Sequence, residues 1–292
     1  MPVPYKRIHI AINPASGKDE PILNTLNHVF SQYDVEWSAS ITHKFGDATE
    51  QARAAIARGV DLVAGYGGDG TQHEIANAVF GTDTVMGILP GGTGNGFARE
   101  MNIPKTLAPA VELLCTSHNT RKIDVAKAGD EYFIQRLYVG IEPEEQTSRE
   151  MKDKYGVFAY AVSLKQQTQS AKRVDYQVLI DGVSAEFRAA KLYVINSGMM
   201  GTGLSITHNY AIDDGLSDGF VLDTVDLSSI KGAVDRFFSR QSNAAERYYR
   251  QGREFVIDTD PDQPVWADGE YIGRTPVTVN VIPGALTIAV PE

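Results

Sequence analysis

The apolar run Val60–Gly65 leads into the glycine-rich loop Gly67-Gly68-Asp69-Gly70-Thr71, and this passage carries the most information about the fold. A short apolar run that ends in glycines is typical of a buried strand that turns directly into a helix. Similar strands are predicted at Ile8–Ile12, Val35–Ile41 and Val85–Leu89. Strands that alternate with helices form a mainly parallel sheet with helices on both faces. We therefore predict a doubly wound α/β domain over residues 1–126.

Helix signals lie between these strands. Asp47 with Glu50, and Thr71 with Glu74, have the spacing of capping boxes, which open helices. Apolar residues also recur at helical spacing after the first strand. These residues are Ile22, Leu26, Val29 and Phe30.

After about Lys127 the sequence changes to short runs of the kind that form strands. We expect strands at Tyr132–Val139, Val174–Ile180, Lys191–Asn196, Phe220–Val225 and Phe255–Thr259. Gly129-Asp130 and Asp181-Gly182 are typical of tight turns between strands. A helix is predicted over Ser228–Gln251, and two strands are predicted in Val277–Pro291 around Pro283-Gly284. Residues 127–292 are thus predicted to form an antiparallel β domain, with the last strand returning to the first domain.

Composition limits the class of protein. Of the 292 residues, 42% are hydrophobic, and the net charge is −10. Since neither half of the chain is basic, nucleic acid is not expected as a partner. Cys115 is the only cysteine, and no apolar run reaches 18 residues. We therefore expect a cytoplasmic chain without an internal disulfide or a membrane span.

Three glycine-rich loops follow three of the predicted strands. Glycine lets backbone N–H groups approach a phosphate closely, and a helix N-terminus behind the loop adds free donors. Each loop alone is equally consistent with an ordinary strand-to-helix turn, whereas three at one sheet edge favour a phosphate site. None has the Walker A or the Rossmann spacing. The loops are Asn13-Pro14-Ala15-Ser16-Gly17-Lys18, Gly67-Gly68-Asp69-Gly70-Thr71 and Pro90-Gly91-Gly92-Thr93-Gly94-Asn95-Gly96.

Gly67-Gly68-Asp69-Gly70-Thr71 resembles the signature shared by diacylglycerol, sphingosine and NAD kinases and phosphofructokinases. Gly87–Asn95 resembles the next motif of the lipid-kinase branch, and Asp213-Asp214-Gly215, Asp268-Gly269-Glu270 and Val281–Leu286 follow in that family's order. The resemblance covers nearly the whole chain and is closest to the bacterial soluble lipid kinases. It implies an NAD kinase-like and diacylglycerol kinase-like first domain followed by an antiparallel β-sandwich.

The resemblance also implies which residues contact ATP. They come from the loops and from one strand end, and Asp69 would lie beside the phosphates and their Mg²⁺. From the residues alone, Thr42 is equally consistent with an ordinary strand end. The implied nucleotide-binding residues are Asn13, Pro14, Ala15, Ser16, Gly17, Thr42, Gly67, Gly68, Asp69, Gly70, Thr71 and Thr93.

The candidate catalytic residues are Glu270, Asp69 and Asp268. Phosphoryl transfer to a hydroxyl needs a carboxylate that accepts the proton. Trp266–Glu270 is predicted to be extended, so that Asp268 and Glu270 project from one face. The resemblance makes Glu270 the general base and leaves Asp268 to orient it or to interact with Mg²⁺. Without the resemblance, an Asp-Gly hairpin turn is the better interpretation.

The acidic stretch 211–219 holds a structural Mg²⁺ in similar bacterial kinases. Carried over, Asp214 gives its carboxylate, while Ala211 and Leu216 give backbone carbonyls. A solvated surface turn is the alternative. Asp124 matches a further family acid, with a role either in catalysis or in packing.

The resemblance implies a Mg-ATP-dependent lipid kinase that meets its membrane substrate peripherally and sometimes dimerises. Diacylglycerol is the expected acceptor, and phosphatidic acid the product. A sphingoid base or phosphatidylglycerol is the alternative, as is a catalytically silent homologue that binds nucleotide or lipid. Two departures from the family pattern bear on this choice. Lipid kinases usually have Asp where this chain has Gly96, and residues 140–145 also differ.

Overall fold

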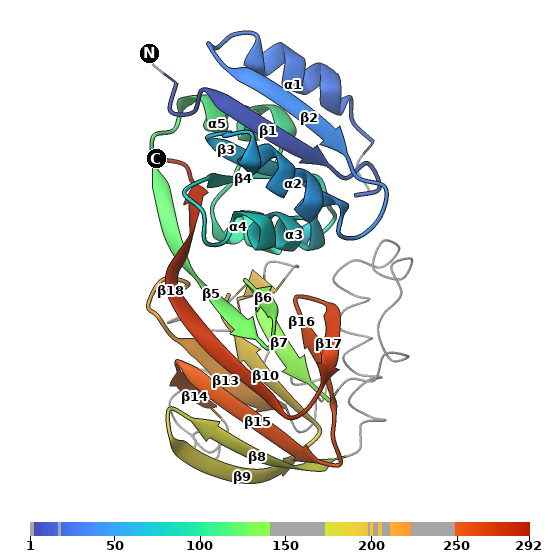
Figure 1. Cartoon of the computed structure of the whole chain (residues 1–292), viewed down its shortest axis with the longest axis vertical. Coiled ribbons are helices and arrows are strands. Elements are labelled where there is room, and N and C mark those ends of the chain that lie inside the picture. The colour runs from blue at the N-terminus through green and yellow to red at the C-terminus, as the bar shows by residue number, and fades with distance from the viewer. Residues whose placement is uncertain are drawn as a thin grey trace. The chain divides into compact units, whose positions relative to one another are not determined.

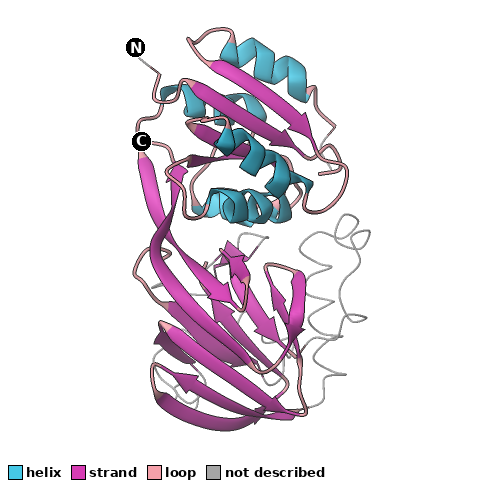
Figure 2. Cartoon of the chain, in the orientation of Figure 1, coloured by secondary structure: helices cyan, strands magenta, loops and turns pink. Residues whose placement is uncertain are grey.

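The computed structural model describes residues 3–16, 19–140, 173–197, 199–200, 204–205, 211–222 and 249–292. The chain forms two compact units. Unit 1 comprises Met1–Ile123, Met199–Leu204 and Gly284–Glu292, and unit 2 comprises Asp124–Gly198 and Ser205–Pro283. Figure 2 shows helices and strands in unit 1 but only strands in the described part of unit 2. The predicted fold class, α/β followed by antiparallel β, is confirmed.

Strands and helices alternate along unit 1 (Figure 1). The four predicted strands are confirmed to within two residues at their ends, and the helix predicted from Ile22, Leu26, Val29 and Phe30 is present. In chain order the elements are β1 (Arg7–Ile12), α1 (Ile22–Phe30), β2 (Glu36–Ile41), α2 (Asp47–Ala57), β3 (Leu62–Gly67), α3 (Asp69–Val79), β4 (Val85–Pro90), α4 (Gly96–Glu100) and α5 (Leu107–Thr116).

The sheet of unit 1 is parallel, in the order β2-β1-β3-β4. The chain leaves β1 towards one edge to form β2 and then returns past β1 to form β3. Right-handed crossovers in opposite directions place α1 on one face and α2 and α3 on the other. The helix contacts agree, since α1 packs against α5 and α2 against α3 (Figure 1). The strand order therefore reverses between β1 and β3, where ligands bind in sheets of this type.

The predicted capping box at the start of α2 is wrong. Asp47 is the first residue of the helix, and the N-cap is Gly46 with φ 92°. The carboxylate of Asp47 accepts the backbone N–H groups of His43 (2.7 Å) and Lys44 (3.1 Å) instead. These two bonds hold the pKa of the Asp47 carboxyl below its usual value. Asp47 thus stabilises the loop before the helix.

The predicted capping box of α3 is also wrong, because α3 begins at Asp69, ahead of Thr71. Its presumed partner Glu74 lies in mid-helix and accepts the N–H groups of Gly46 (2.9 Å) and Ala48 (3.1 Å). Burial raises the pKa of the Glu74 carboxyl, and these bonds act in the opposite direction. Because α2 packs against α3, the donors at the start of α2 find their acceptor on a neighbouring helix.

Unit 2 consists of antiparallel strands in two layers. One layer has the order β18-β15-β8-β9, and the other has the order β14-β13-β10-β7-β16-β17. Strand β5 pairs with β6 and β18. A two-stranded ribbon of β11 and β12 follows β10 in the chain and belongs to unit 1 except for Ser205. In chain order, the strands after α5 are β5 (Thr120–Ala128), β6 (Glu131–Phe133), β7 (Arg136–Val139), β8 (Val174–Ile180), β9 (Val183–Ala189), β10 (Lys191–Ile195), β11 (Met199–Met200), β12 (Leu204–Ser205), β13 (Ser217–Leu222), β14 (Tyr249–Gly252), β15 (Glu254–Asp260), β16 (Pro264–Ala267), β17 (Glu270–Arg274) and β18 (Val277–Ala289).

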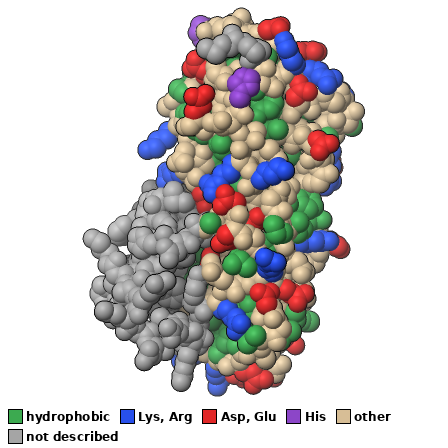
Figure 3. Space-filling model, turned by 90° about the vertical axis from the view of Figure 1, so that its left-hand side faces the viewer, with side chains coloured by type: hydrophobic (Ala, Val, Ile, Leu, Met, Phe, Trp, Pro, Cys, Tyr) green, Lys and Arg blue, Asp and Glu red, His purple; other side chains and the backbone are tan. Residues whose placement is uncertain are grey.

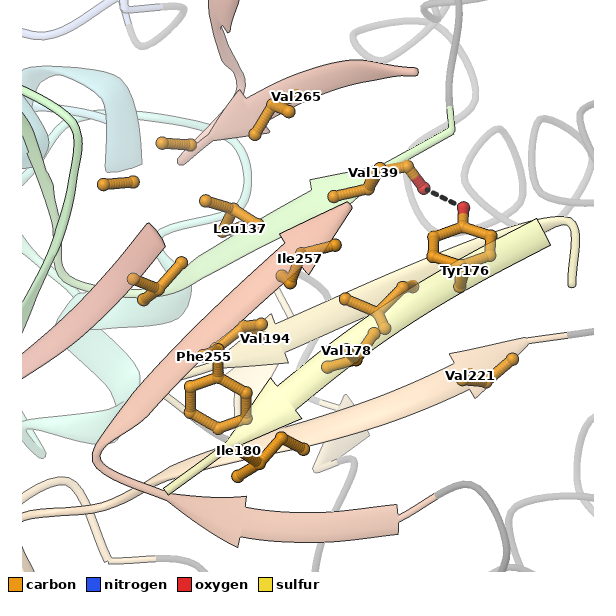
Figure 4. Packing of buried hydrophobic residues seen from close by; sticks show 14 of the residues in the cluster. Leu137, Val139, Tyr176, Val178, Ile180, Val194, Val221, Phe255, Ile257 and Val265 are labelled. Carbon is orange, nitrogen blue, oxygen red and sulfur yellow. Dashed lines mark hydrogen bonds between the residues drawn. The ribbon is translucent and has the colours of Figure 1, made fainter. Parts of the chain in front are cut away.

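The core of unit 2 lies between these layers (Figure 4). Val178 and Phe255 come from one layer, and Val139, Val194 and Val265 come from the other. In β8 every second residue is buried, as expected for a strand with one face in a core. Burying these side chains is the main stabilising contribution to a sandwich of this kind.

A row of aromatic rings crosses five strands of the second layer, on the face opposite that core. Each ring lies directly across from the next in the strand register, and adjacent centroids are 5.0–6.2 Å apart. Pairs of this kind stabilise neighbouring strands. In spatial order the row is Phe220, Tyr193, Tyr138, Trp266 and Tyr271.

Three predictions for the second half need correction. The predicted strand Tyr132–Val139 is two strands, because the N–H groups of its middle residues donate to a distant carboxylate. The end of the predicted helix Ser228–Gln251 is wrong, since Tyr249–Gly252 forms β14; residues 228–248 lie outside the described residues. The two strands predicted in Val277–Pro291 are one continuous strand, β18. The turns at Gly129-Asp130 and Asp181-Gly182 are confirmed.

Figure 3 shows one face of the chain, on which positive and negative side chains are interspersed. No helix within the described ranges is both long and apolar enough to cross a membrane.

Candidate functional site

The carboxyl ends of β1, β2 and β3 are tied together by hydrogen bonds. The N–H of Asn13, after β1, donates to the carbonyl of Tyr66 in β3 (2.9 Å). The N–H of Thr42, after β2, donates to the carbonyl of Ile12 (2.9 Å). The side-chain amide of Asn13 donates to the Oγ1 of Thr71 (3.1 Å). The first two predicted loops and Thr42 therefore meet at one sheet edge, where the strand order reverses.

The loop after β1 is shaped by Asn13. Its Oδ1 accepts the N–H of Ala15 (3.0 Å), and its carbonyl accepts the hydroxyl of Ser16 (2.8 Å). These bonds turn the chain tightly and leave Pro14 and Ala15 exposed. Gly17, the remaining predicted residue of this loop, lies outside the described residues.

The loops after β3 and β4 touch through their glycines. The N–H of Gly91 donates to the carbonyl of Gly67 (3.0 Å). A Cβ at Gly92 would lie 2.5 Å from the Cα of Gly68, so only glycine permits this approach of two backbones. A Cβ at Gly70 would meet nothing within 4 Å. The loops are thus closely packed at one point and open at Gly70, in the first turn of α3.

Asp69 connects α3 to α4. Its two carboxylate oxygens accept the N–H groups of Gly96 (3.1 Å) and Phe97 (3.0 Å), the first residues of α4. Asn95 precedes them with φ 50°, and its Oδ1 accepts the N–H of Gly92 (2.9 Å). The third loop is therefore held in shape by Asp69 and Asn95, while Thr93 at its tip is exposed. Sequence reasoning assigned no role to Asn95, although the Asn-Gly pair is a turn signal.

In unit 2, the prediction of an extended Trp266–Glu270 is wrong. Asp268 and Gly269 form the two-residue turn between β16 and β17, with φ 48° and 97°. Positive φ at both positions is what a tight hairpin of this kind requires, and Asp and Gly tolerate it. The alternative interpretation, an Asp-Gly hairpin turn, is correct. Asp268 and Glu270 consequently do not share one face of a strand.

The carboxylate of Asp268 is fully engaged by backbone donors. Its Oδ2 accepts the N–H of Ile134 (2.8 Å), and its Oδ1 accepts those of Gln135 (3.0 Å) and Arg136 (2.8 Å). The N–H of Asp268 donates back to the carbonyl of Arg136 (2.9 Å). Asp268 thus ties the hairpin to the segment between β6 and β7.

Glu270 is the first residue of β17 and lies opposite Ala267. It is half-buried. Within the described part of the chain, no hydrogen bond or ion pair engages its carboxylate. The two acidic residues of the Asp268-Gly269-Glu270 motif therefore differ, because Asp268 accepts three backbone N–H groups and Glu270 accepts none from the described residues.

The acidic segment 211–216 lies beside the buried side chain of Asp124. The Oδ2 of Asp124 accepts the N–H of Gly215 (2.6 Å), and the Oδ1 of Asp214 accepts that of Leu216 (3.0 Å). Burial raises the pKa of the Asp214 carboxyl, and the charges of Asp124 and Asp213 raise it further. No cluster of three His, Cys, Asp or Glu side chains suited to a metal occurs in the described ranges. The predicted Mg²⁺ site is of a different kind, because it would combine the carboxylate of Asp214 with the backbone carbonyls of Ala211 and Leu216.

Comparisons with known proteins agree with this arrangement of a glycine-loop unit and a β-sandwich. Residues 7–128 match the diacylglycerol kinase catalytic domain, and residues 136–290 match the YegS C-terminal NAD kinase beta sandwich-like domain. The chain is therefore a lipid kinase. It belongs to the diacylglycerol kinase-like lipid kinase family.

Curated relatives align over most of their length. The chain is 27% identical over 280 residues to a diacylglycerol kinase of Staphylococcus saprophyticus, covering 93% of this chain and 91% of that protein. For a diacylglycerol kinase of Staphylococcus aureus strain MRSA252, the identity is 27%, and the coverage is 93% and 88%. A crystal structure of a diacylglycerol kinase from Bacillus anthracis strain Sterne superposes with a TM-score of 0.80 at 26% identity, covering 99% and 98%.

Proposed function

We propose that this enzyme transfers the γ-phosphate of ATP to the free hydroxyl of diacylglycerol, which yields phosphatidic acid and ADP. The observation that carries the ATP half of the proposal is the set of loops at one edge of the parallel sheet, closely packed at Gly68 and Gly92 and open at Gly70. The acceptor is proposed from the curated relatives, which are named diacylglycerol kinases. Because diacylglycerol is a membrane lipid, the enzyme would act at a membrane surface.

In this proposal the backbone N–H groups of the loops bind the phosphates. Gly70 lies in the first turn of α3, whose N-terminal dipole and free donors favour anions. The exposed Thr93 supplies a hydroxyl from the neighbouring loop. Asp69 keeps α4 in place, and its carboxylate would lie beside the Mg²⁺ that arrives with ATP.

Glu270 is the proposed general base. The lipid oxygen attacks the γ-phosphorus, the bond between that phosphorus and the leaving oxygen of ADP breaks, and the hydroxyl proton passes to Glu270. A carboxylate that accepts this proton contributes about 10² to 10⁴ in rate. Asp268 has a different role in the proposal, because its oxygens already accept three backbone N–H groups. It positions the hairpin that carries Glu270.

The segment 211–216 fits a structural Mg²⁺ by its donor chemistry. Oxygen donors are those that Mg²⁺ prefers, and Asp214 has one carboxylate oxygen bonded to Leu216 and the other available. Burial, and then the charges of Asp124 and Asp213, raise the pKa of Asp214. A cation here would offset the repulsion among these three carboxylates. When bound, Mg²⁺ would fix the conformation of this segment.

The proposal is tested with purified protein, labelled ATP and Mg²⁺, and mixed micelles of diacylglycerol, sphingosine, ceramide or phosphatidylglycerol. NAD serves as a non-lipid acceptor. Glu270→Gln removes the proposed base, and Glu186→Gln makes the same chemical change at an exposed position of β9. We expect phosphate transfer to diacylglycerol that is lost in Glu270→Gln and kept in Glu186→Gln.

Other outcomes would change the assignment. Transfer to sphingosine or phosphatidylglycerol alone would replace the acceptor but keep the kinase chemistry. Binding of ATP without transfer to any acceptor would favour the silent homologue. Full turnover of Glu270→Gln would remove Glu270 from the role of base.

A further inference from the structure

Asn196 directly follows β10 and is completely buried. Its side-chain amide nitrogen donates to the carbonyls of Asp124 (2.9 Å) and Ile134 (3.1 Å). Its Oδ1 accepts the hydroxyl of Ser217 (3.3 Å), and its backbone N–H donates to the carbonyl of Gln135 (2.8 Å). One side chain therefore links three segments that are far apart in the sequence.

One side of this network reaches the acidic segment. Besides binding Asn196 through its carbonyl, Asp124 donates its N–H to the carbonyl of Ile212 (2.8 Å) and accepts the N–H of Gly215 through Oδ2 (2.6 Å). Ser217 directly follows the segment and is fully buried. The amide of Asn196 thus contacts both residues that hold the segment against the sandwich.

The other side of this network reaches the hairpin of β16 and β17, which carries Glu270. The carbonyls of Ile134 and Gln135 accept hydrogen bonds from Asn196. The backbone N–H groups of residues 134–136 donate to the carboxylate of Asp268. Asp268 is the first turn residue of the hairpin, and Glu270 lies two positions later. The orientation of Glu270 therefore depends on a segment that Asn196 holds in place.

We propose that Asn196 is a positioning residue that aligns Glu270 by fixing residues 134–136 beneath the Asp268-Gly269 turn and joining them to the 211–216 segment. This inference rests on the proposed function only for its kinetic consequence. Asn196 acts through Asp268 and is not proposed to touch the substrate.

Asparagine is required here by its hydrogen-bonding pattern. Two donors on one nitrogen meet two carbonyls, and one acceptor meets the hydroxyl of Ser217. Aspartate would place oxygen against both carbonyls, and an apolar residue would remove all three of these buried hydrogen bonds. Ser217→Ala removes one bond only and is the milder test.

The experiment compares Asn196→Ala, Ser217→Ala and the control Val194→Ala. Val194 lies in β10 two positions before Asn196, is fully buried and points into the sandwich core, so its truncation weakens packing without breaking the network. The measurements are kcat, the KM values for ATP and lipid, and hydrogen exchange of peptides that contain residues 134–136 and 268–270.

We expect Asn196→Ala to lower kcat by about 10- to 100-fold with little change in the KM for ATP, because a small displacement of a catalytic group has effects of this size. Ser217→Ala should lower kcat by about threefold, since one of the bonds to Asn196 is lost. Exchange in both peptides should be faster in Asn196→Ala than in Val194→Ala.

Equal kcat values and equal exchange in Asn196→Ala and Val194→Ala would overturn the inference. If Asn196→Ala does not fold, Ser217→Ala decides: unchanged kcat and unchanged exchange would overturn it. If the wild-type protein transfers no phosphate, the proposed function fails, and the exchange comparison still tests whether Asn196 holds the hairpin.

Discussion

Asp69, Asp268 and Glu270 are three acidic residues of the sequence motifs, but their partners differ. Asp69 and Asp268 accept backbone N–H groups from residues 27 to 28 and 132 to 134 positions away. Glu270 has no such partner in the described part of the chain. A carboxylate that organises backbone contributes to stability, whereas one that is free to accept a proton can contribute to catalysis.

Asp268→Asn should therefore lower stability. An amide NH₂ would replace one of two oxygens that together accept three N–H groups, and at least one donor would lose its partner. We expect the free energy of unfolding to fall by about 1–3 kcal/mol. Urea unfolding checks this, with Asp130→Asn, an exposed acid of the same unit, as control. Equal midpoints for the two variants would contradict it.

His9 should make unit 1 sensitive to acid. Its Nδ1 and Nε2 lie 2.8 Å and 2.9 Å from the hydroxyls of Ser38 and Ser40, and burial, with a smaller effect of Arg58, lowers its pKa to about 4. The unfolded ring takes up its proton near pH 6.5. The stabilising effect of the neutral ring is thus complete above pH 6.5 and lost as the pH falls towards 4, by on the order of 2 kcal/mol.

The measurement is the free energy of unfolding from pH 7 to pH 4 for the wild type, His9→Gln and the exposed control His28→Gln. His9→Gln should reduce the pH dependence, and His28→Gln should leave it unchanged. Identical profiles for all three proteins would show that His9 does not titrate in this way.

At the scale of elements, two glycines have opposite surroundings. Gly92 meets the backbone of Gly68, while Gly70 faces open space at the start of α3. One glycine is needed for the loops to pack together. The other leaves room for a ligand at the helix N-terminus.

Gly92→Ala and Gly70→Ala should therefore separate stability from binding. Gly92→Ala forces two backbones apart and should lower the free energy of unfolding by about 1–3 kcal/mol. Gly70→Ala should keep or slightly raise stability, because alanine is the better helix residue, by up to about 1 kcal/mol. It should nevertheless weaken ATP binding if phosphates approach this backbone.

Urea unfolding and ATP titration calorimetry on both variants provide the test. Wild-type ATP affinity in Gly70→Ala would place the phosphates away from this turn. Wild-type stability in Gly92→Ala would mean that the two loops can separate without cost.

At the scale of the whole chain, the two long strands β5 and β18 each run from one unit into the other. β5 passes from unit 1 to unit 2 after Ile123, and β18 passes back after Pro283. Neither strand is interrupted at the boundary. If one unit unfolds, the other consequently loses part of two strands.

We expect the two units to unfold in one cooperative transition. The chain has two tryptophans, Trp37 in unit 1 and Trp266 in unit 2. Trp266→Phe leaves Trp37, which packs against Phe30, as the reporter of unit 1. Trp37→Phe leaves Trp266, which stacks on Tyr138, as the reporter of unit 2. Within each variant, the urea midpoint measured by fluorescence should coincide with the urea midpoint measured by circular dichroism. Clearly separate midpoints would show that the units unfold independently.

The sequence by itself determined the alternation of strands and helices in unit 1, the fold class and the family. Strand periods, helical spacing and glycine turns depend on neighbouring residues, so they can be read without tertiary information. The same locality explains the four strands of unit 1 and the turns at Gly129-Asp130 and Asp181-Gly182.

Only the tertiary structure decided which groups the polar side chains bind. The carboxylate of Glu74 accepts a backbone N–H at the start of another helix, and that of Asp268 accepts backbone N–H groups more than 130 positions earlier in the chain. The side chain of Asn196 joins three segments that are distant in the sequence. These partners follow from helix packing and strand pairing, which bring donors and acceptors together at long sequence separation. Because a buried N–H or carboxylate must find a partner wherever the fold provides one, spacing along the chain could not predict these contacts.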